Sequence, residues 1–128
     1  MEFPKDLHYA KTHEWVKKSG DTVIIGISAF AVEQLGDITL VELPDVDTAL
    51  DAEATMGTIE SVKSVSDIYA PITGTVSKIN EELDDTPELV NEEPYGTGWF
   101  IEVTPADMGD VDKLLDANAY AAFVAAED

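Results

Sequence analysis

The sequence contains no cysteine and no arginine, and its basic side chains are seven lysines and two histidines. Without cysteine the chain has no disulfide, no thiolate metal site and no cysteine nucleophile. Without clustered basic residues, nucleic acid and anionic membranes are excluded as main partners. No apolar run approaches the ~20 residues of a transmembrane helix, and residues 1–4 do not begin a signal peptide. We therefore expect a cytosolic protein.

Acidic residues dominate the charge, with 27 Asp plus Glu and a formal net charge of −20. An apolar fraction of 45% nevertheless argues against disorder. The acidic residues are spread along the chain, which indicates a surface coated with carboxylates. Their mutual repulsion is screened at molar salt, where the Debye length is about 3 Å. The composition therefore favours a high-salt cytoplasm, as in halophilic archaea, over an ordinary acidic protein.

The length of 128 residues fits one domain, residues 1–128, with a substantial core. Apolar spacing and turn residues predict a β-rich body followed by C-terminal helices at about 107–126, capped by Asp107 and Asp116. Ser28 can cap a short helix over 29–35 that ends at Gly36. We expect strands at 14–18, 22–27, 37–43, 54–62, 65–70, 72–79 and 99–103, and a loop at 46–53. This pattern predicts a mainly β sandwich with short peripheral helices.

Lys63 is the only lysine between Lys18 and Lys78, in a stretch that holds ten carboxylates. The flanking sequence predicts a hairpin at about 54–70 with Lys63-Ser64 as its turn. In that register like residues face one another: Val62 and Val65, Ser61 and Ser66, Glu60 and Asp67, Ile59 and Ile68. Tight hairpin turns favour Asn-Gly or other Gly-containing pairs, which this turn lacks. The turn therefore favours the display of a lysine for modification over an ordinary exposed lysine.

The motifs of common active sites are absent from the sequence. It has no Gly-rich phosphate loop, no nucleophile elbow, and no zinc or calcium signature. His8 and His13 are five positions apart in a region that reads as loop and strand, so we do not expect a metal site there. No serine has a histidine base nearby in the sequence. We therefore expect a protein that is not a catalyst.

Several motifs give the chain a resemblance to a known family over nearly its whole length. They are His13-Glu14-Trp15, Gly26-Ile27-Ser28, Leu35-Gly36-Asp37-Ile38, Glu60-Ser61-Val62-Lys63-Ser64, Ala70-Pro71, Leu89-Val90-Asn91 and Pro94-Tyr95-Gly96-Thr97-Gly98-Trp99. In these segments the chain resembles the H proteins of the glycine cleavage system. One departure is Asp47, at a position where the family usually turns with glycine.

The resemblance implies a lipoyl-type fold, the barrel-sandwich hybrid, with lipoic acid in amide linkage to Lys63. The attachment motif would be Glu60, Ser61, Val62 and Ser64. The lipoyl group on Lys63 would act as a swinging arm. This arm would carry an aminomethyl group from the P protein (a pyridoxal-phosphate glycine decarboxylase) to the T protein (an aminomethyltransferase). The L protein, a flavoprotein dehydrogenase, would reoxidise it. A lipoate ligase or lipoyl-synthesis enzymes would modify the chain. Because the dithiolane supplies the thiol–disulfide chemistry, a chain without cysteine can take this role in glycine catabolism and one-carbon metabolism.

Two carboxylates are candidates for protecting the loaded arm. The cargo's amine is cationic at neutral pH and favours a carboxylate in a partly desolvated groove. Glu14 lies in the His13-Glu14-Trp15 motif, beside an aromatic residue that could cover the arm. Asp67 would face Glu60 across the hairpin, and two facing carboxylates indicate a cation nearby. In so acidic a chain, such an acidic pair also arises by chance.

Other classes of protein also display a lysine. The sequence argues against two of them and does not decide between the remaining roles. Lipoyl domains of 2-oxo acid dehydrogenases usually carry Asp-Lys-Ala and lack a helical C-terminus. Biotinyl domains place methionine beside the lysine, where this chain has Val62 and Ser64. An H-like lipoate relay, which hands lipoyl groups to other acceptors, is not separated by sequence from a glycine cleavage carrier. An acidic interaction domain would leave Lys63 unmodified.

Overall fold

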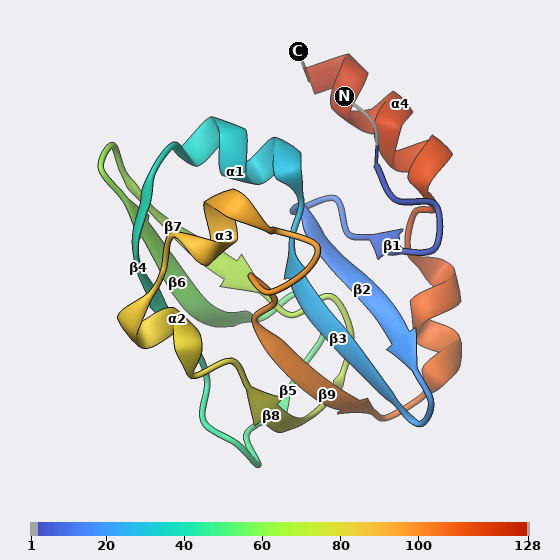
Figure 1. The fold of residues 1–128 in the computed structure, drawn as a ribbon. Coiled ribbons are helices and arrows are strands. Elements are labelled where there is room, and N and C mark those ends of the chain that lie inside the picture. The colour runs from blue at the N-terminus through green and yellow to red at the C-terminus, as the bar shows by residue number, and fades with distance from the viewer. Residues whose placement is uncertain (1–2, 128) are drawn as a thin grey trace.

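The computed structural model describes residues 3–127, which form two antiparallel sheets with short helices around them (Figure 1). The larger sheet has the strand order β1-β2-β3-β9-β8-β5, and the smaller has the order β4-β6-β7. The strands are β1 (His8–Tyr9), β2 (Glu14–Ser19), β3 (Thr22–Ile27), β4 (Ile38–Glu42), β5 (Ala49–Leu50), β6 (Thr55–Ser61), β7 (Val65–Tyr69), β8 (Gly74–Ile79) and β9 (Ile101–Pro105). The expected mainly β sandwich is therefore confirmed.

The first hairpin, β2–β3, forms as its turn residues predict. Ser19 pairs with Thr22, and Gly20 supplies a positive φ of 65° between them. Three expectations for strands need correction. The strand expected at 72–79 begins two residues later, at Gly74. The segment 46–53, expected as a loop, contains β5, which pairs with β8 at the edge of the larger sheet. The strand expected at 99–103 begins two residues later and continues to Pro105.

The main core lies between the inner faces of the two sheets. Val41, Ile59 and Ile68 of the smaller sheet are buried in one cluster with residues of the larger sheet, among them Val23, Ile25, Val76 and Val103. Their alternation with polar residues explains the fold, because each strand buries one face only. Strand β7 is an edge strand of the smaller sheet, and within residues 3–127 its one strand partner is β6.

Three of the helices in residues 3–127 begin at a side chain that caps them. In α1 (Ala29–Leu35) the Ser28 hydroxyl accepts a bond from Ala31 N, and Gly36 follows at a φ of 83°. Two one-turn helices follow β8: α2 (Glu82–Asp85) and α3 (Leu89–Glu92). The first C-terminal helix is a 3₁₀ helix (Met108–Lys113) capped by Asp107, and the second is α4 (Ala117–Glu127), where Asp116 accepts from Ala119 N.

A second, aromatic cluster holds α4 against the N-terminal strands. The rings of Tyr9 and Tyr120 stack with centroids 4.5 Å apart, and Phe3 packs edge-on against both. Trp15 belongs to the same cluster and donates from Nε1 to the Pro94 carbonyl over 2.9 Å. Within residues 3–127, no helix has the length and apolar character needed to cross a membrane.

Candidate functional site

The tip of the β6–β7 hairpin presents Val62 and Lys63, with Ser61 and Ser64 at its base. Ser61 N donates to Ser64 O over 2.8 Å. The Ser61 hydroxyl accepts from the amides of Lys63 and Ser64 over 3.2 and 3.1 Å. The expected Lys63-Ser64 turn is therefore wrong by one residue, since Lys63 is the second residue of a Val62-Lys63 turn. A side-chain acceptor at Ser61 satisfies amide donors of the turn without glycine or asparagine.

The hairpin register also differs from the expected one. Ile59 pairs with Ser66, Glu60 with Val65 and Thr58 with Asp67. Glu60 and Asp67 therefore do not face each other as expected, and no repulsion within that pair calls for a cation. The two registers differ by two residues, so every side chain keeps the same face in both. Hydrophobic alternation alone could not distinguish them.

Lys63 is exposed, and its aliphatic stem lies beside Gly36. A Cβ added to Gly36 would lie 3.3 Å from Lys63 Cε. Gly36 also has a φ of 83° and a ψ of −152°, a combination almost restricted to glycine. Among residues 3–127, no carboxylate lies within ion-pair distance of the Lys63 amine. The amine is thus displayed and not held down by a salt bridge.

The backbone around the tip is held by Asn91 and Asp37. The side-chain amide of Asn91 donates from Nδ2 to Gly36 O and accepts at Oδ1 from Ile38 N, both over 2.9 Å. Asp37 lies between these two residues, and its carbonyl accepts from Val62 N over 3.1 Å. These bonds join α3, the α1–β4 connection and the hairpin tip. They give the Leu89-Val90-Asn91 motif a role in fixing the position of Lys63.

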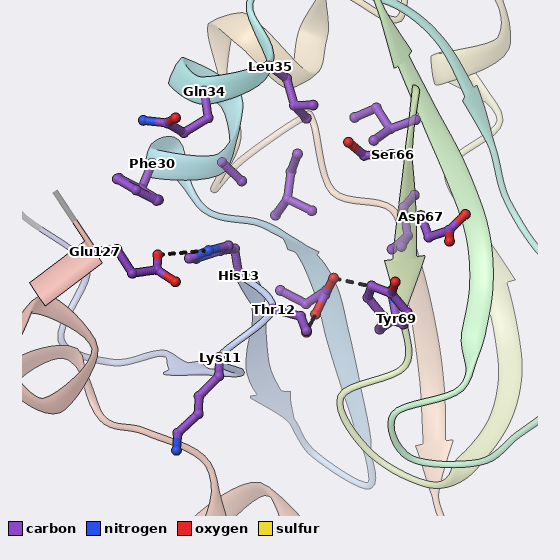
Figure 2. Close-up of a pocket in the computed structure, with 15 residues that line it drawn as sticks. Lys11, Thr12, His13, Phe30, Gln34, Leu35, Ser66, Asp67, Tyr69 and Glu127 are labelled. Atoms are coloured by element: carbon purple, nitrogen blue, oxygen red, sulfur yellow. Dashed lines mark hydrogen bonds and ion pairs between the residues drawn. The ribbon is translucent and has the colours of Figure 1, made fainter. Parts of the chain in front are cut away.

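A groove of about 770 Å³ lies beside the hairpin, between α1 and the edge of β7 (Figure 2). One part of the groove is lined by Ser66, which is close to Lys63 in sequence, and by Leu35, which adjoins Gly36 beside the Lys63 stem. Another part is lined by His13 and Glu14. Its apolar wall consists of Ile27, Phe30, Ala31, Leu35, Ile59 and Ile68. Its volume falls within the range of small-molecule pockets. The other lining residues are polar or charged, so the groove fits an acyl chain along its apolar wall and a polar end group elsewhere.

Glu14 is a buried carboxylate in this groove, with 1% of its surface exposed. It accepts hydrogen bonds from the Thr12 hydroxyl and, over 3.2 Å, from Tyr69 N on the free edge of β7. Burial raises its pKa from 4.5 to about 7, although these bonds oppose the shift. Among residues 3–127 no cationic side chain forms an ion pair with it. A buried carboxylate without a cation favours the binding of a positively charged group.

Asp67 lines the same groove from β7, but its side chain is exposed. Figure 2 shows its carboxylate directed away from His13 and Glu127. This direction follows from strand alternation, since the next residue, Ile68, is buried on the opposite face. The structure thus brings Glu14 and Asp67 to one groove but turns the Asp67 carboxylate outward.

Sequence reasoning missed a polar chain that joins α4 to the groove. The Tyr120 hydroxyl lies 2.6 Å from His13 Nδ1 and 2.7 Å from the Ser28 hydroxyl. His13 Nε2 lies 3.3 Å from a Glu127 carboxylate oxygen, and burial lowers the pKa of His13 while Glu127 opposes that shift. His13 also adopts a left-handed φ of 82°. The His13-Glu14-Trp15 motif pointed to this place, but partners 107 positions away could not be read from it.

The loop at Asp47 keeps the backbone conformation that usually calls for glycine. Asp47 has a φ of 73°, in the left-handed region, and its N–H donates to Val76 O over 2.8 Å. Aspartate tolerates this region better than most residues, although less well than glycine. Aspartate at this position therefore makes the loop conformation less favourable than glycine would, but the backbone still adopts the same left-handed turn.

A two-sheet sandwich that displays one lysine on a hairpin tip, beside a groove with a buried carboxylate, defines a carrier domain of the lipoyl class. The family model for the glycine cleavage H-protein matches residues 7–127. The chain therefore belongs to the glycine cleavage H-protein family.

Similar proteins cover almost the full chain. A glycine cleavage system H protein of Geobacillus thermodenitrificans is 53% identical over 97% of this chain and 98% of its own. That of Thermus thermophilus is 50% identical over 94% of both chains. A crystal structure of the H protein from Mycobacterium marinum aligns with a TM-score of 0.89 at 37% identity, covering 96% of this chain and 99% of that one. These relatives are bacterial and give no support to an archaeal source.

Proposed function

We propose that Lys63 carries a lipoyl group in amide linkage and that residues 1–128 act as one carrier domain. As a member of its family, the chain is a carrier subunit of the glycine cleavage system and not a catalyst. The observation that carries the proposal is the exposed Lys63 amine, which has no ion pair among the described residues. Its stem lies beside Gly36, and the preceding residue, Leu35, lines the groove.

The residues around Lys63 support its role as the target of a modifying enzyme. Ser61 shapes the turn through its hydroxyl, and Val62 is fixed by its bond to Asp37 O. Ser64 completes the turn with its bond from Ser61 N, and Glu60 points outward opposite Val65. These four residues are the proposed recognition motif for a lipoate ligase or for the enzymes of lipoyl synthesis.

The groove fits the proposed prosthetic group and its cargo. When bound, lipoate would supply a dithiol that alternates with a disulfide and holds the one-carbon cargo. Ile27, Phe30 and Leu35 offer an apolar wall that would exclude water from the acyl chain. Glu14 would hold the cationic amine of the aminomethyl cargo through a charge-assisted hydrogen bond. Asp67 would add negative potential at the rim.

The buried Glu14 favours glycine cleavage over a role restricted to lipoate relay. A relay needs an accessible amide-linked lipoyl group but no site for a cationic cargo. A carboxylate that is buried without a cation is costly to keep ionised, so its presence fits a cargo that carries an amine. The cargo would come from the P protein and go to the T protein, and the L protein would reoxidise the arm.

The attachment site is tested with Lys63→Arg, which keeps the charge and removes the nucleophilic amine. A purified lipoate ligase, with ATP and lipoate, should modify the parent protein once and the variant not at all. Lys78→Arg is the matched control and should be modified like the parent. Intact mass and peptide mapping give the readout. Modification of the Lys63→Arg variant at another lysine would overturn the assignment.

A further inference from the structure

The exposed apolar side chains gather around Lys63. Four large apolar residues are exposed in the part of the chain that the structure describes: Leu40 (38%), Val46 (46%), Val62 (69%) and Val65 (63%). Val62 adjoins Lys63, and Val65 follows two positions later. Leu40 lies on β4, whose pairing with β6 brings it opposite Glu60. Only Val46 lies elsewhere, in the loop that leaves the far end of β4.

The strand register places Leu40 and Val65 on one face of the smaller sheet, and Val62 lies in the turn beyond them. Leu40 pairs with Glu60, and Glu60 pairs with Val65, so the three side chains form one row across the smaller sheet. The next row, farther from the hairpin tip, contains Glu42, Thr58 and Asp67. The outer face therefore has Leu40 and Val65 on either side of Glu60 in the row close to Lys63. The row behind it has Glu42 and Asp67 on either side of Thr58 and is termed here the acidic row.

This arrangement has no role in the core of the protein. Val41, Ile59 and Ile68 already supply the buried inner face of the same strands. On the outer face, an exposed valine at 63% costs solubility and offers the fold little burial. Apolar residues surrounded by charged ones are typical of a surface that another protein covers.

We propose that Leu40, Val62 and Val65, termed here the outer patch, form the docking surface for the enzyme that attaches lipoate to Lys63. The inference rests on the proposed function and extends it to a partner. The complementary surface of that enzyme is apolar, with basic side chains that meet Glu42, Glu60 and Asp67.

The position of the outer patch selects this enzyme among the partners. The attaching enzyme must bring an activated lipoyl carboxyl to the Lys63 amine itself, one lysine side chain from the hairpin backbone. There the neutral amine attacks the carboxyl carbon of lipoyl adenylate, the bond to the phosphate breaks, and AMP leaves as the nitrogen loses a proton. The partners that act later meet the dithiol, a further acyl chain away, and are free to dock elsewhere. The surface nearest the amine therefore belongs to the enzyme that modifies it.

The test compares Leu40→Thr and Val65→Thr with the matched control Val46→Thr. Threonine is β-branched and therefore suits a strand, and it replaces apolar surface with a hydroxyl. The readout is kcat/KM for modification by a purified lipoate ligase with ATP and lipoate. Each outer-patch variant should lose about tenfold, the loss of one strong interface contact. The Val46→Thr rate should match the parent. Glu42→Lys, which reverses charge in the acidic row, should also slow modification, and this loss should shrink at high salt.

Each outcome separates the inference from the proposed function. If the parent protein is not modified at Lys63, the proposed function itself fails. If the parent is modified and both outer-patch variants match its rate, the docking inference is overturned. It is also overturned if the variants are modified normally but, once lipoylated, support glycine decarboxylation poorly, because the patch would then serve the decarboxylase. Slower modification with normal decarboxylation after full lipoylation supports it.

Discussion

Replacing Glu14 with glutamine gives a direct measure of the carboxylate buried in the groove. Glu14 is 1% exposed, and burial raises its pKa from 4.5 to about 7. The folded protein therefore holds this proton more tightly than the unfolded chain. The resulting stabilisation is complete below about pH 4.5 and is lost as the pH rises through 7. The shift corresponds to about 3 kcal/mol between the two limits.

The assay is urea unfolding of the parent and Glu14→Gln proteins across pH 4 to 8 in molar KCl. Glutamine keeps the size of the side chain and cannot titrate, so the parent should lose stability relative to the variant as the pH rises. The amide can accept from only one oxygen, so the bonds from Thr12 and Tyr69 are not both kept. The lost bond lowers the variant's free energy of unfolding by about 1 kcal/mol at every pH. It does not change how the stability difference between the two proteins varies with pH.

Glu33→Gln is the matched control, because Glu33 is exposed on α1. Its stability difference from the parent should stay nearly flat over the same pH range. The lipoylated Glu14→Gln protein should also release ammonia and formaldehyde faster when loaded with aminomethyl cargo, whereas Asp67→Asn should have a smaller effect. A pH-independent difference between parent and Glu14→Gln, together with cargo release at the parent rate, would refute the role given to this carboxylate.

Three further predictions concern stability. The melting temperature should rise between low and molar KCl, because screening relieves repulsion in a chain of net charge −20; a flat or falling midpoint would remove the high-salt interpretation. Asp47→Gly should stabilise the protein by up to about 1 kcal/mol in urea unfolding, because Asp47 has a φ of 73°; a loss of stability would show that the aspartate side chain supports the loop. Tyr120→Phe should cost about 1–3 kcal/mol, because His13 and Ser28 lose their shared hydroxyl partner; an unchanged unfolding midpoint would contradict this.

Local signals allowed much of the fold to be predicted. Ser28 and Gly36 bound α1 as expected, because capping and a positive φ depend on residues next to one another in sequence. The β2–β3 hairpin and the caps at Asp107 and Asp116 followed for the same reason. The isolation of Lys63 in an acidic hairpin already indicates a displayed lysine, whereas the resemblance supplies the lipoyl group and the aminomethyl cargo that makes Glu14 a candidate.

Long-range details could not be obtained in this way. The hairpin register was wrong by two residues because both registers bury Ile59 and Ile68. The turn was wrong by one residue because the Ser61 hydroxyl takes the place of a glycine-type turn. The chain from Glu127 through His13 to Tyr120 joins the two ends of the sequence, which no local pattern reports.

The carrier role is tested by reconstituted glycine decarboxylation, with the fully lipoylated protein as the acceptor for a purified P protein. We expect release of carbon dioxide that depends on both glycine and this protein and that is absent with Lys63→Arg. Adding the T protein and tetrahydrofolate should then release ammonia. A fully lipoylated protein that supports no decarboxylation, but passes its lipoyl group to other acceptors, would instead be a lipoate relay protein.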